Sequence, residues 1–183
     1  MNDRERLLQI LHERSLIYGD ITLSSGQKSH YYIDGKQTTL DGEGIALIAR
    51  LMLPKLRDVD AVGGPTLGAD PFLGALLAVC HEAGVPMVGF IVRKEVKNHG
   101  TQKVIEGPLK SGMRVALVED VITTGGSALL AADKIEAAGC KIVRVLALLD
   151  RQQGGAEAFH ARGYEFCPLF TKDDLKIQPP SQT

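Results

Sequence analysis

Acidic, hydroxyl and glycine residues gather near the middle of the chain, in an order that could bind a phosphorylated sugar. A short apolar run comes first and is typical of a strand buried on both faces. Two carboxylates stand at its end, a turn rich in threonine and glycine follows, and good helix formers come next. The stretch reads Val115-Ala116-Leu117-Val118-Glu119-Asp120-Val121-Ile122-Thr123-Thr124-Gly125-Gly126-Ser127.

The strand, turn and helix together predict an anion site, because backbone N–H groups and a helix N-terminus would meet at the turn. Gly125 and Gly126 allow close approach to a phosphate, and the hydroxyls of the turn add donors. Glu119 and Asp120 would repel a phosphate but suit the hydroxyls of a sugar that carries it. The predicted ligand is a ribose 5-phosphate. The alternative is an ordinary strand-to-helix turn, and the stretch matches neither a Walker loop nor G-x-G-x-x-G.

A basic segment precedes this turn. Residues 93–107 carry four Lys or Arg against two Glu, a net charge of +2 with His neutral. Arg93, Lys94, Lys97 and His99 stand at its start. A long loop of this kind is often a lid, and its cations would stabilise negative charge that develops on a diphosphate leaving group. The alternative is a solvated connection without a function.

Alternating strand and helix patterns supply the scaffold for these residues. They predict an α/β domain whose mainly parallel sheet is flanked by helices and binds its ligand at the C-terminal strand ends. Predicted helices cover 3–14, 42–56, 71–83, 127–138 and 156–161, and predicted strands cover 21–23, 29–33, 61–63, 87–92, 114–118, 142–149 and 164–169. We expect one domain over 1–183, with a hood over about 1–40, a core over about 41–170, a mobile loop over 93–107 and a disordered tail over about 177–183.

Composition excludes several classes of protein. The 183 residues are 44% hydrophobic and 23% charged, with a net charge of −1, so nucleic acid and membrane partners are not expected. No run is long and apolar enough for a membrane span, and the N-terminus lacks a signal-peptide pattern. Cys80, Cys140 and Cys167 show no C-x-x-C spacing and are expected to be small buried residues in a reducing compartment. We therefore predict a cytoplasmic location.

The central stretch resembles the phosphoribosyl diphosphate (PRPP) motif of type I phosphoribosyltransferases, without a break over 115–127. Three further stretches resemble the orotate phosphoribosyltransferases in particular. They are Arg-Lys-x-x-Lys-x-His-Gly over 93–100, Leu-Asp-Arg over 149–151 and Gly-Asp-Ile-Thr-Leu-Ser-Ser-Gly-Gln-Lys-Ser-His-Tyr-Tyr over 19–32. The resemblance implies the type I phosphoribosyltransferase fold, with a small N-terminal hood and a flexible catalytic loop.

The resemblance also implies residue roles. Glu119 and Asp120 would hold the ribose 2- and 3-hydroxyls, and 123–127 would hold the 5-phosphate. The residues implied to bind PRPP are Arg93, Lys94, Lys97, His99, Glu119, Asp120, Val121, Ile122, Thr123, Thr124, Gly125, Gly126 and Ser127, and Lys94, Lys97 and His99 among them would be catalytic. Thr123 and Arg151 would contact orotate, whose carboxylate a guanidinium can pair with through two hydrogen bonds. A surface ion pair of Arg151 with Asp150 or Glu157 is the alternative.

The implied reaction is the Mg²⁺-dependent transfer of 5-phosphoribose from PRPP to orotate. It gives orotidine 5-phosphate and pyrophosphate in de novo pyrimidine (UMP) synthesis. Mg²⁺ would be held by PRPP and water, with no protein side chain as ligand. The resemblance implies a homodimer in which part of the loop enters the neighbouring subunit's site. The alternatives are transfer to another base, such as a purine, and a PRPP-sensing regulator without catalysis.

The sequence departs from the family pattern at Ser24 and in the turn over 64–68, and it leaves open which of two tyrosines faces the substrate. Ser24 stands where many relatives have a lysine, and the turn over 64–68 lacks a Tyr-Lys pair found in them. Lys28 is a candidate replacement for the missing cation. Tyr31 and Tyr32 are adjacent on a predicted strand and point to opposite faces, so at most one of them can meet a flat pyrimidine.

Overall fold

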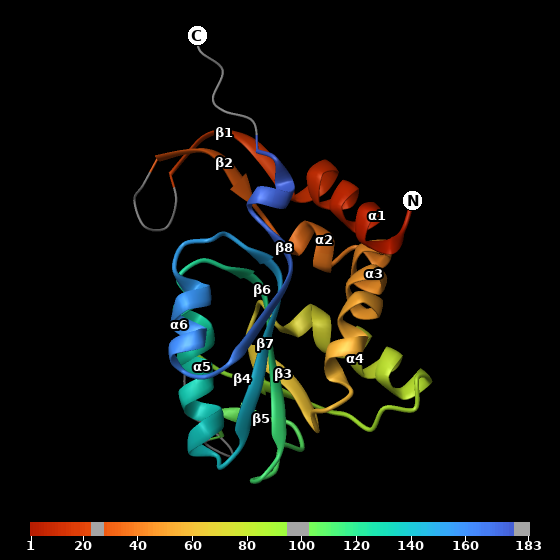
Figure 1. Cartoon of the computed structure of the whole chain (residues 1–183), viewed down its shortest axis with the longest axis vertical. Helices are drawn as coiled ribbons and strands as arrows, with labels where there is room; N and C mark the ends of the chain where they lie inside the picture. The colour runs from red at the N-terminus through yellow and green to blue at the C-terminus, as the bar shows by residue number, and fades with distance from the viewer. Residues whose placement is uncertain (23–27, 95–102, 178–183) are drawn as a thin grey trace.

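The computed structural model describes residues 1–22, 28–94 and 103–177, which fold around a six-stranded sheet (Figure 1). The strand order is β5-β4-β3-β6-β7-β8, and all neighbours are parallel except β4 and β5. The strands are β3 (Ala61–Pro65), β4 (Val88–Val92), β5 (Ile105–Glu106), β6 (Arg114–Ile122), β7 (Lys141–Asp150) and β8 (Glu165–Thr171). The predicted α/β class with a mainly parallel sheet is confirmed.

Helices cover both faces of this sheet, so that each face has its own apolar core (Figure 1). Along β6 the side chains alternate: Val115 and Leu117 pack with α5 and α6, whereas Ala116 and Val118 pack with α1, α3 and α4. This burial on both faces is why the strand is continuously apolar. The helices are α1 (Asp3–Ile10), α2 (Lys36–Thr39), α3 (Gly42–Met52), α4 (Asp70–Glu82), α5 (Gly126–Ala137) and α6 (Gly155–Ala161), with shorter turns η1 (Leu11–Ser15), η2 (Leu53–Leu56) and η3 (Asp173–Leu175).

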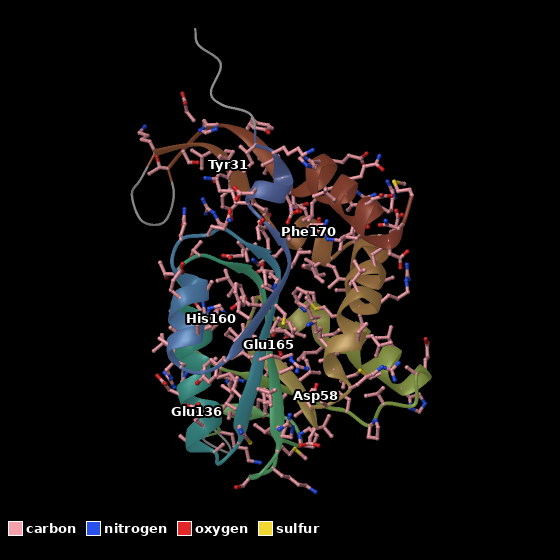
Figure 2. The ribbon with its side chains drawn as sticks, viewed as in Figure 1. Tyr31, Asp58, Glu136, His160, Glu165 and Phe170 are labelled. Carbon is pink, nitrogen blue, oxygen red and sulfur yellow. The ribbon has the colours of Figure 1, made fainter. Side chains whose placement is uncertain are left out.

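The N-terminal hairpin forms a hood at one end of the sheet (Figure 1). Its strands β1 (Leu16–Thr22) and β2 (Lys28–Ile33) pair antiparallel, which confirms the predicted hairpin, although β1 begins well before the predicted residue 21. Tyr31 lies in this hood, whereas Asp58 lies toward the other end of the molecule (Figure 2). Of the two tyrosines, Tyr31 is buried and Tyr32 is 40% exposed, as alternation along a strand requires.

Strand β6 is longer than the predicted 114–118 and contains the two carboxylates. Glu119 pairs with Ala147 and Val121 with Leu149, so the backbone stays in the sheet as far as Ile122. The parallel neighbour β7 extends to Asp150 and offers hydrogen-bonding partners there. Glu119 and Asp120 are each 7% exposed. Their burial follows from their place in the sheet and could not be predicted from their residue types.

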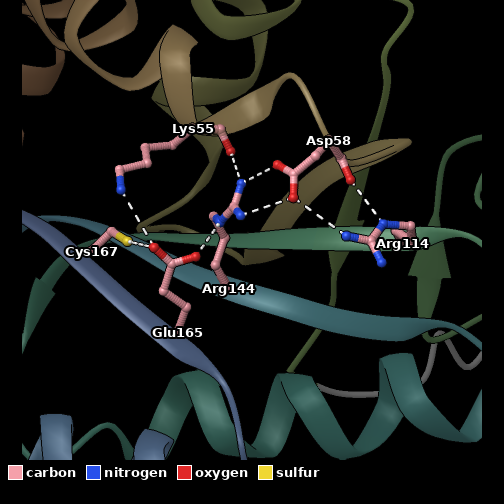
Figure 3. A network of polar contacts seen from close by, with 6 residues as sticks. All are labelled: Lys55, Asp58, Arg114, Arg144, Glu165 and Cys167. Carbon is pink, nitrogen blue, oxygen red and sulfur yellow. Dashed lines mark hydrogen bonds and ion pairs between the residues drawn. The ribbon is translucent and has the colours of Figure 1, made fainter.

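A network of charged side chains ties the other end of the sheet together (Figure 3). The guanidinium of Arg144, at the start of β7, contacts both carboxylate oxygens of Asp58, and its Nε lies 3.0 Å from Glu165 Oε2. Arg114 at the start of β6 donates to the Asp58 carbonyl over 2.8 Å. These contacts join the N-terminal ends of neighbouring strands, opposite the hood. No helix in the described part of the chain has the length and apolarity to span a membrane.

Candidate functional site

The acid pair and the turn after it line one cavity of about 160 Å³. The lining residues are Glu119, Asp120, Val121, Ile122, Thr123, Gly125, Gly126, Ser127 and Ala128. All residues predicted to bind a ribose 5-phosphate are in this set except Thr124, which lies in the same turn. The structure thus brings hydroxyl and backbone donors and two carboxylates together around one cavity.

The turn is shaped by Gly125. Its backbone has φ +79°, a left-handed conformation that residues with a side chain rarely adopt. The chain then enters α5 at Gly126, so the free N–H groups of the first helical turn open toward the cavity that Gly126 and Ser127 line. A helix N-terminus with these free donors and a favourable dipole fits a phosphate group.

Glu119 is enclosed between strand β6 and the turn that precedes α4. A Cβ atom added to Gly68 would lie 1.6 Å from Glu119 Oε1 and 3.0 Å from Asp120 Oδ1, so only a glycine fits against both carboxylates. Burial, together with the charge of Asp120, raises the pKa of the Glu119 carboxyl to about 8. Near neutral pH, Glu119 is therefore largely protonated.

Lys36 completes this cluster, and the sequence analysis missed it. Its ammonium, at the start of α2 beneath the hood, lies 3.0 Å from Asp120 Oδ2. This hydrogen bond raises the pKa of the Lys36 ammonium. Lys28, the cation proposed from the sequence, is instead exposed at the start of β2. Ser24 lies outside the described residues. No local pattern connects Lys36 with Asp120, which is 84 residues away.

The root of the basic loop lies beside the turn. A second cavity, of about 270 Å³, is lined by Pro65, Val92, Arg93, Lys94, Ser127, Leu130, Ala131 and Lys134, and it shares Ser127 with the first. Lys134 of α5 donates to the carbonyls of Arg93 and Lys94 over 2.8 and 3.1 Å. The predicted residues Lys97 and His99 lie outside the described residues.

The two ends of the predicted loop over 93–107 pair through backbone hydrogen bonds, which the prediction of a mobile loop did not include. The Arg93 N–H donates to the Val104 carbonyl over 2.9 Å, and Ile105 pairs with Val92 across β4 and β5. Arg93 also forms an ion pair with Glu106 at 3.6 Å. Backbone pairing with β4 explains why residues 105–106 form a strand although their segment has no apolar period.

Arg151 lies on the far side of the acid pair, at the C-terminal end of β7. It is buried, with 8% exposure, which argues against the alternative of a surface ion pair. Its guanidinium carbon is 5.8 Å from the centre of the Tyr31 ring. Asp150 Oδ1 accepts instead from the backbone N–H of Gln152 over 2.8 Å. The guanidinium of Arg151 and the aromatic ring of Tyr31 therefore lie close together where the core meets the hood.

Two arginine nitrogens near the cavity have no partner. Within the described chain, the Nε atoms of Arg93 and Arg151 are both buried without a hydrogen-bond acceptor. An unpaired buried donor is costly, and an anionic ligand would supply the acceptor. In residues 1–22, 28–94 and 103–177, no three His, Cys, Asp or Glu side chains are grouped as metal ligands would be.

Comparisons with known proteins agree with this geometry. A family model described as the phosphoribosyl transferase domain matches residues 37–167. The chain is 47% identical to an orotate phosphoribosyltransferase of Synechocystis sp. over 175 residues, which cover 94% of this chain and 88% of the relative. It is similar to crystal structures of the Mycobacterium tuberculosis orotate phosphoribosyltransferase. The complex with Fe(III) dicitrate has a TM-score of 0.84, 40% identity and coverage of 96% and 100%. The complex with PRPP has a TM-score of 0.80, 38% identity and the same coverage.

Proposed function

Since this chain belongs to the phosphoribosyltransferase family, and within it to the orotate phosphoribosyltransferases, we propose that its acid pair, glycine turn and flanking arginines form the site that transfers 5-phosphoribose from PRPP to orotate. The products are orotidine 5-phosphate and pyrophosphate, as de novo pyrimidine synthesis requires. One observation carries the assignment of residues. The cavity lined by 119–128 lies at the end of β6, which the sheet order places between β4 and β7. Arg93 and Arg151, which directly follow those two strands, have buried Nε donors without an acceptor among the described residues.

The groups around the cavity suit different parts of PRPP. Carboxylates of Glu119 and Asp120 accept hydrogen bonds from the ribose 2- and 3-hydroxyls, and the donors over 123–127 bind the 5-phosphate. Arg93 and Lys94 line a second cavity that shares Ser127 with the first, which supports their role in binding the diphosphate together with Lys97 and His99 of the same loop. Arg151 and Thr123 take the orotate carboxylate and ring edge.

The chain acts by placing the reactants and stabilising charge. As the bond from ribose C1 to the diphosphate oxygen lengthens, cations of the loop stabilise the charge that grows on the leaving pyrophosphate. A ring nitrogen of the orotate that Arg151 and Thr123 hold attacks C1 from the opposite face, and its proton passes to the leaving pyrophosphate. Bound Mg²⁺ supplies neutralisation of the diphosphate charge. Substrate phosphates and water would supply the ligands of this ion.

We further infer a homodimer in which each loop contributes to the partner's site. The first support is the sequence resemblance. The second is an exposed apolar side chain near the start of the loop: Leu130, which lines the second cavity with Arg93 and Lys94, is 66% exposed. A partner would cover this apolar surface. The expectation of a cytoplasmic enzyme is likewise a prediction.

The direct test follows orotate absorbance in a mixture of the protein, PRPP and Mg²⁺. We expect orotate to be consumed, consumption to stop with EDTA, and adenine, xanthine and uracil to remain unused. Turnover of a purine would keep the ribose-phosphate assignment and overturn that of Arg151. Tight PRPP binding without turnover of any base would instead indicate a regulator.

Replacement of Gly68 by alanine tests the placement of the acid pair. The added Cβ would overlap Glu119 Oε1, so the carboxyl must move. We expect kcat/KM for PRPP to fall by roughly 10- to 100-fold, because displacements of about 1 Å have such effects in active sites. Gly74→Ala is the matched control: an added Cβ meets nothing within 4 Å, and this exposed position lies in α4. Its activity should equal that of the wild type, and equal activity of Gly68→Ala would contradict the assignment.

The raised pKa of Glu119 predicts that PRPP binding releases a proton. In the free protein this carboxyl, with a pKa of about 8, is protonated near neutral pH. Two ribose hydroxyls donate best to the ionised form, so binding lowers the pKa and releases up to about one proton. Affinity should therefore rise with pH up to about 8 and then level off. Calorimetry in buffers of different ionisation enthalpy measures the release. Glu119→Gln should abolish it; an unchanged proton count would refute this role.

A further inference from the structure

Lys36 contacts the acid pair through its side chain from a position next to the hood, and it has no part in the reaction described above. It stands at the start of α2, directly after the hood strand β2. Asp34 holds its backbone in place: Asp34 Oδ1 accepts the Lys36 N–H over 3.1 Å, and Asp34 Oδ2 accepts from Gln37 over 3.0 Å. The lysine therefore reaches the site from a fixed position.

The preceding residue brings the same segment against Asp120. A Cβ added to Gly35 would lie 3.0 Å from Val121 Cγ2 and 3.3 Å from Asp120 Cβ, so the backbone there packs directly on β6. Lys36 then extends along this contact to Asp120. Its side chain is 41% exposed, whereas that of Asp120 is 11% exposed. The ammonium thus sits at the mouth of the site and the carboxylate inside it.

Both oxygens of Asp120 are engaged. Oδ1 accepts the N–H of Val121 over 2.8 Å, and Oδ2 accepts the Lys36 ammonium over 3.0 Å. These two hydrogen bonds determine the rotamer of the carboxylate, since each oxygen has a partner from a different element. They also leave lone pairs on both oxygens for incoming hydroxyl donors.

The charge of the site follows from the same contact. Lys36 forms an ion pair with Asp120 at 3.0 Å, so a positive charge stands beside this carboxylate before the ligand enters. Without Lys36, a ligand with several negative charges would approach an uncompensated carboxylate.

We propose that Lys36 is a positioning residue of the sugar site, which orients Asp120 toward the ribose hydroxyls and neutralises its charge. This role rests on the proposed function, because it requires that Asp120 binds the ribose. Lys36 acts through Asp120 and does not itself hold the diphosphate.

The test is calorimetric binding of PRPP and of ribose 5-phosphate, which shares the sugar but lacks the diphosphate. Lys36→Met should weaken the binding of both ligands alike, by up to about fivefold for one partly exposed ion pair. Lys36→Arg should bind within about twofold of the wild type, because the charge is kept. A loss confined to PRPP would overturn the proposal and assign Lys36 to the diphosphate. Unchanged binding of both ligands would also overturn it.

A double-mutant cycle separates positioning from a general effect on folding. If Lys36 acts through Asp120, adding Lys36→Met to the Asp120→Asn variant should weaken ligand binding by less than about a further twofold. Full additivity would contradict the proposal. Lys55→Met is the matched control: this lysine is 51% exposed and pairs with Glu165 at 3.4 Å, at the other end of the sheet. It should bind both ligands as the wild type does. If the wild type itself fails to bind PRPP, the proposed function has failed and not this inference alone.

Discussion

Replacement of Arg151 by glutamine is expected to lower kcat/KM for orotate by about 10²–10³-fold, because a buried pair between guanidinium and carboxylate is lost. Arg151 is 8% exposed, and its Nε has no acceptor within the described residues. Orotate would supply that acceptor from its carboxylate, beside the Tyr31 ring. Affinity for PRPP should not change, since the acid pair and the turn are untouched. Steady-state kinetics with orotate and calorimetry with PRPP measure the two effects.

Two controls make this prediction specific. Arg151→Lys keeps the charge but not the planar pair of donors, so its activity should be intermediate. Uracil lacks the carboxylate, so discrimination between orotate and uracil should shrink in Arg151→Gln by the same factor. The variant should be at least as stable as the wild type, because an unsatisfied buried donor is removed. Orotate kinetics within about threefold of the wild type would refute the assignment of Arg151.

Replacement of Lys97 by alanine is expected to reduce kcat by roughly 10²–10³-fold, the scale of losing one donor to a developing negative charge. Lys97 lies outside the described residues, and its role rests on the resemblance and on the anchored root of its loop. Lys134 holds the carbonyls of Arg93 and Lys94, so the chain enters the loop beside the phosphate turn. KM for orotate should change little. A kcat within about threefold of the wild type would exclude this role.

The two variants together test the shared loop. In a mixed dimer of Lys97→Ala and Arg151→Gln subunits, a loop that enters the partner's site would restore one intact site of the two. Random mixing in equal amounts should then recover about a quarter of wild-type activity from two nearly inactive proteins. A loop that serves its own subunit would recover none. Separately tagged subunits, purified as mixed dimers after refolding, would give the activity per mixed dimer directly.

Much of the fold could be read from local patterns. The run from Val115 to Val118 predicts a strand buried on both faces, and the structure shows its side chains alternating between two cores. Asp41 caps α3 through the Gly44 N–H, over 2.9 Å, and Pro71 lies in the first turn of α4, so these helices begin close to where the sequence predicts. Helix starts and buried strands depend on neighbouring residues, which a sequence displays.

Element ends were less predictable, since they depend on partners that are distant along the chain. The predicted strand 114–118 stopped at the carboxylates, because charged residues rarely continue a buried strand. In the structure β7 pairs with β6 as far as Ile122. Of the three cysteines, Cys80 and Cys140 are buried as predicted, whereas Cys167 is only partly buried on β8. The length of β6 follows from its pairing with β7, and the partial exposure of Cys167 follows from its place on the edge strand β8.

The sequence by itself determined which residues line the proposed sugar-phosphate site, because the acid pair, glycine turn and helix start lie within one stretch, 119–128. Local order along the chain is enough for a phosphate turn, whose donors are consecutive backbone and side-chain groups. Only the tertiary structure decided which cation meets Asp120 and that Tyr31 and not Tyr32 is buried. It also decided that the Nε donors of Arg93 and Arg151 are buried without a partner among the described residues. Those relations join residues from different elements, and they arise only when hydrophobic burial brings the hood, the sheet and α5 together.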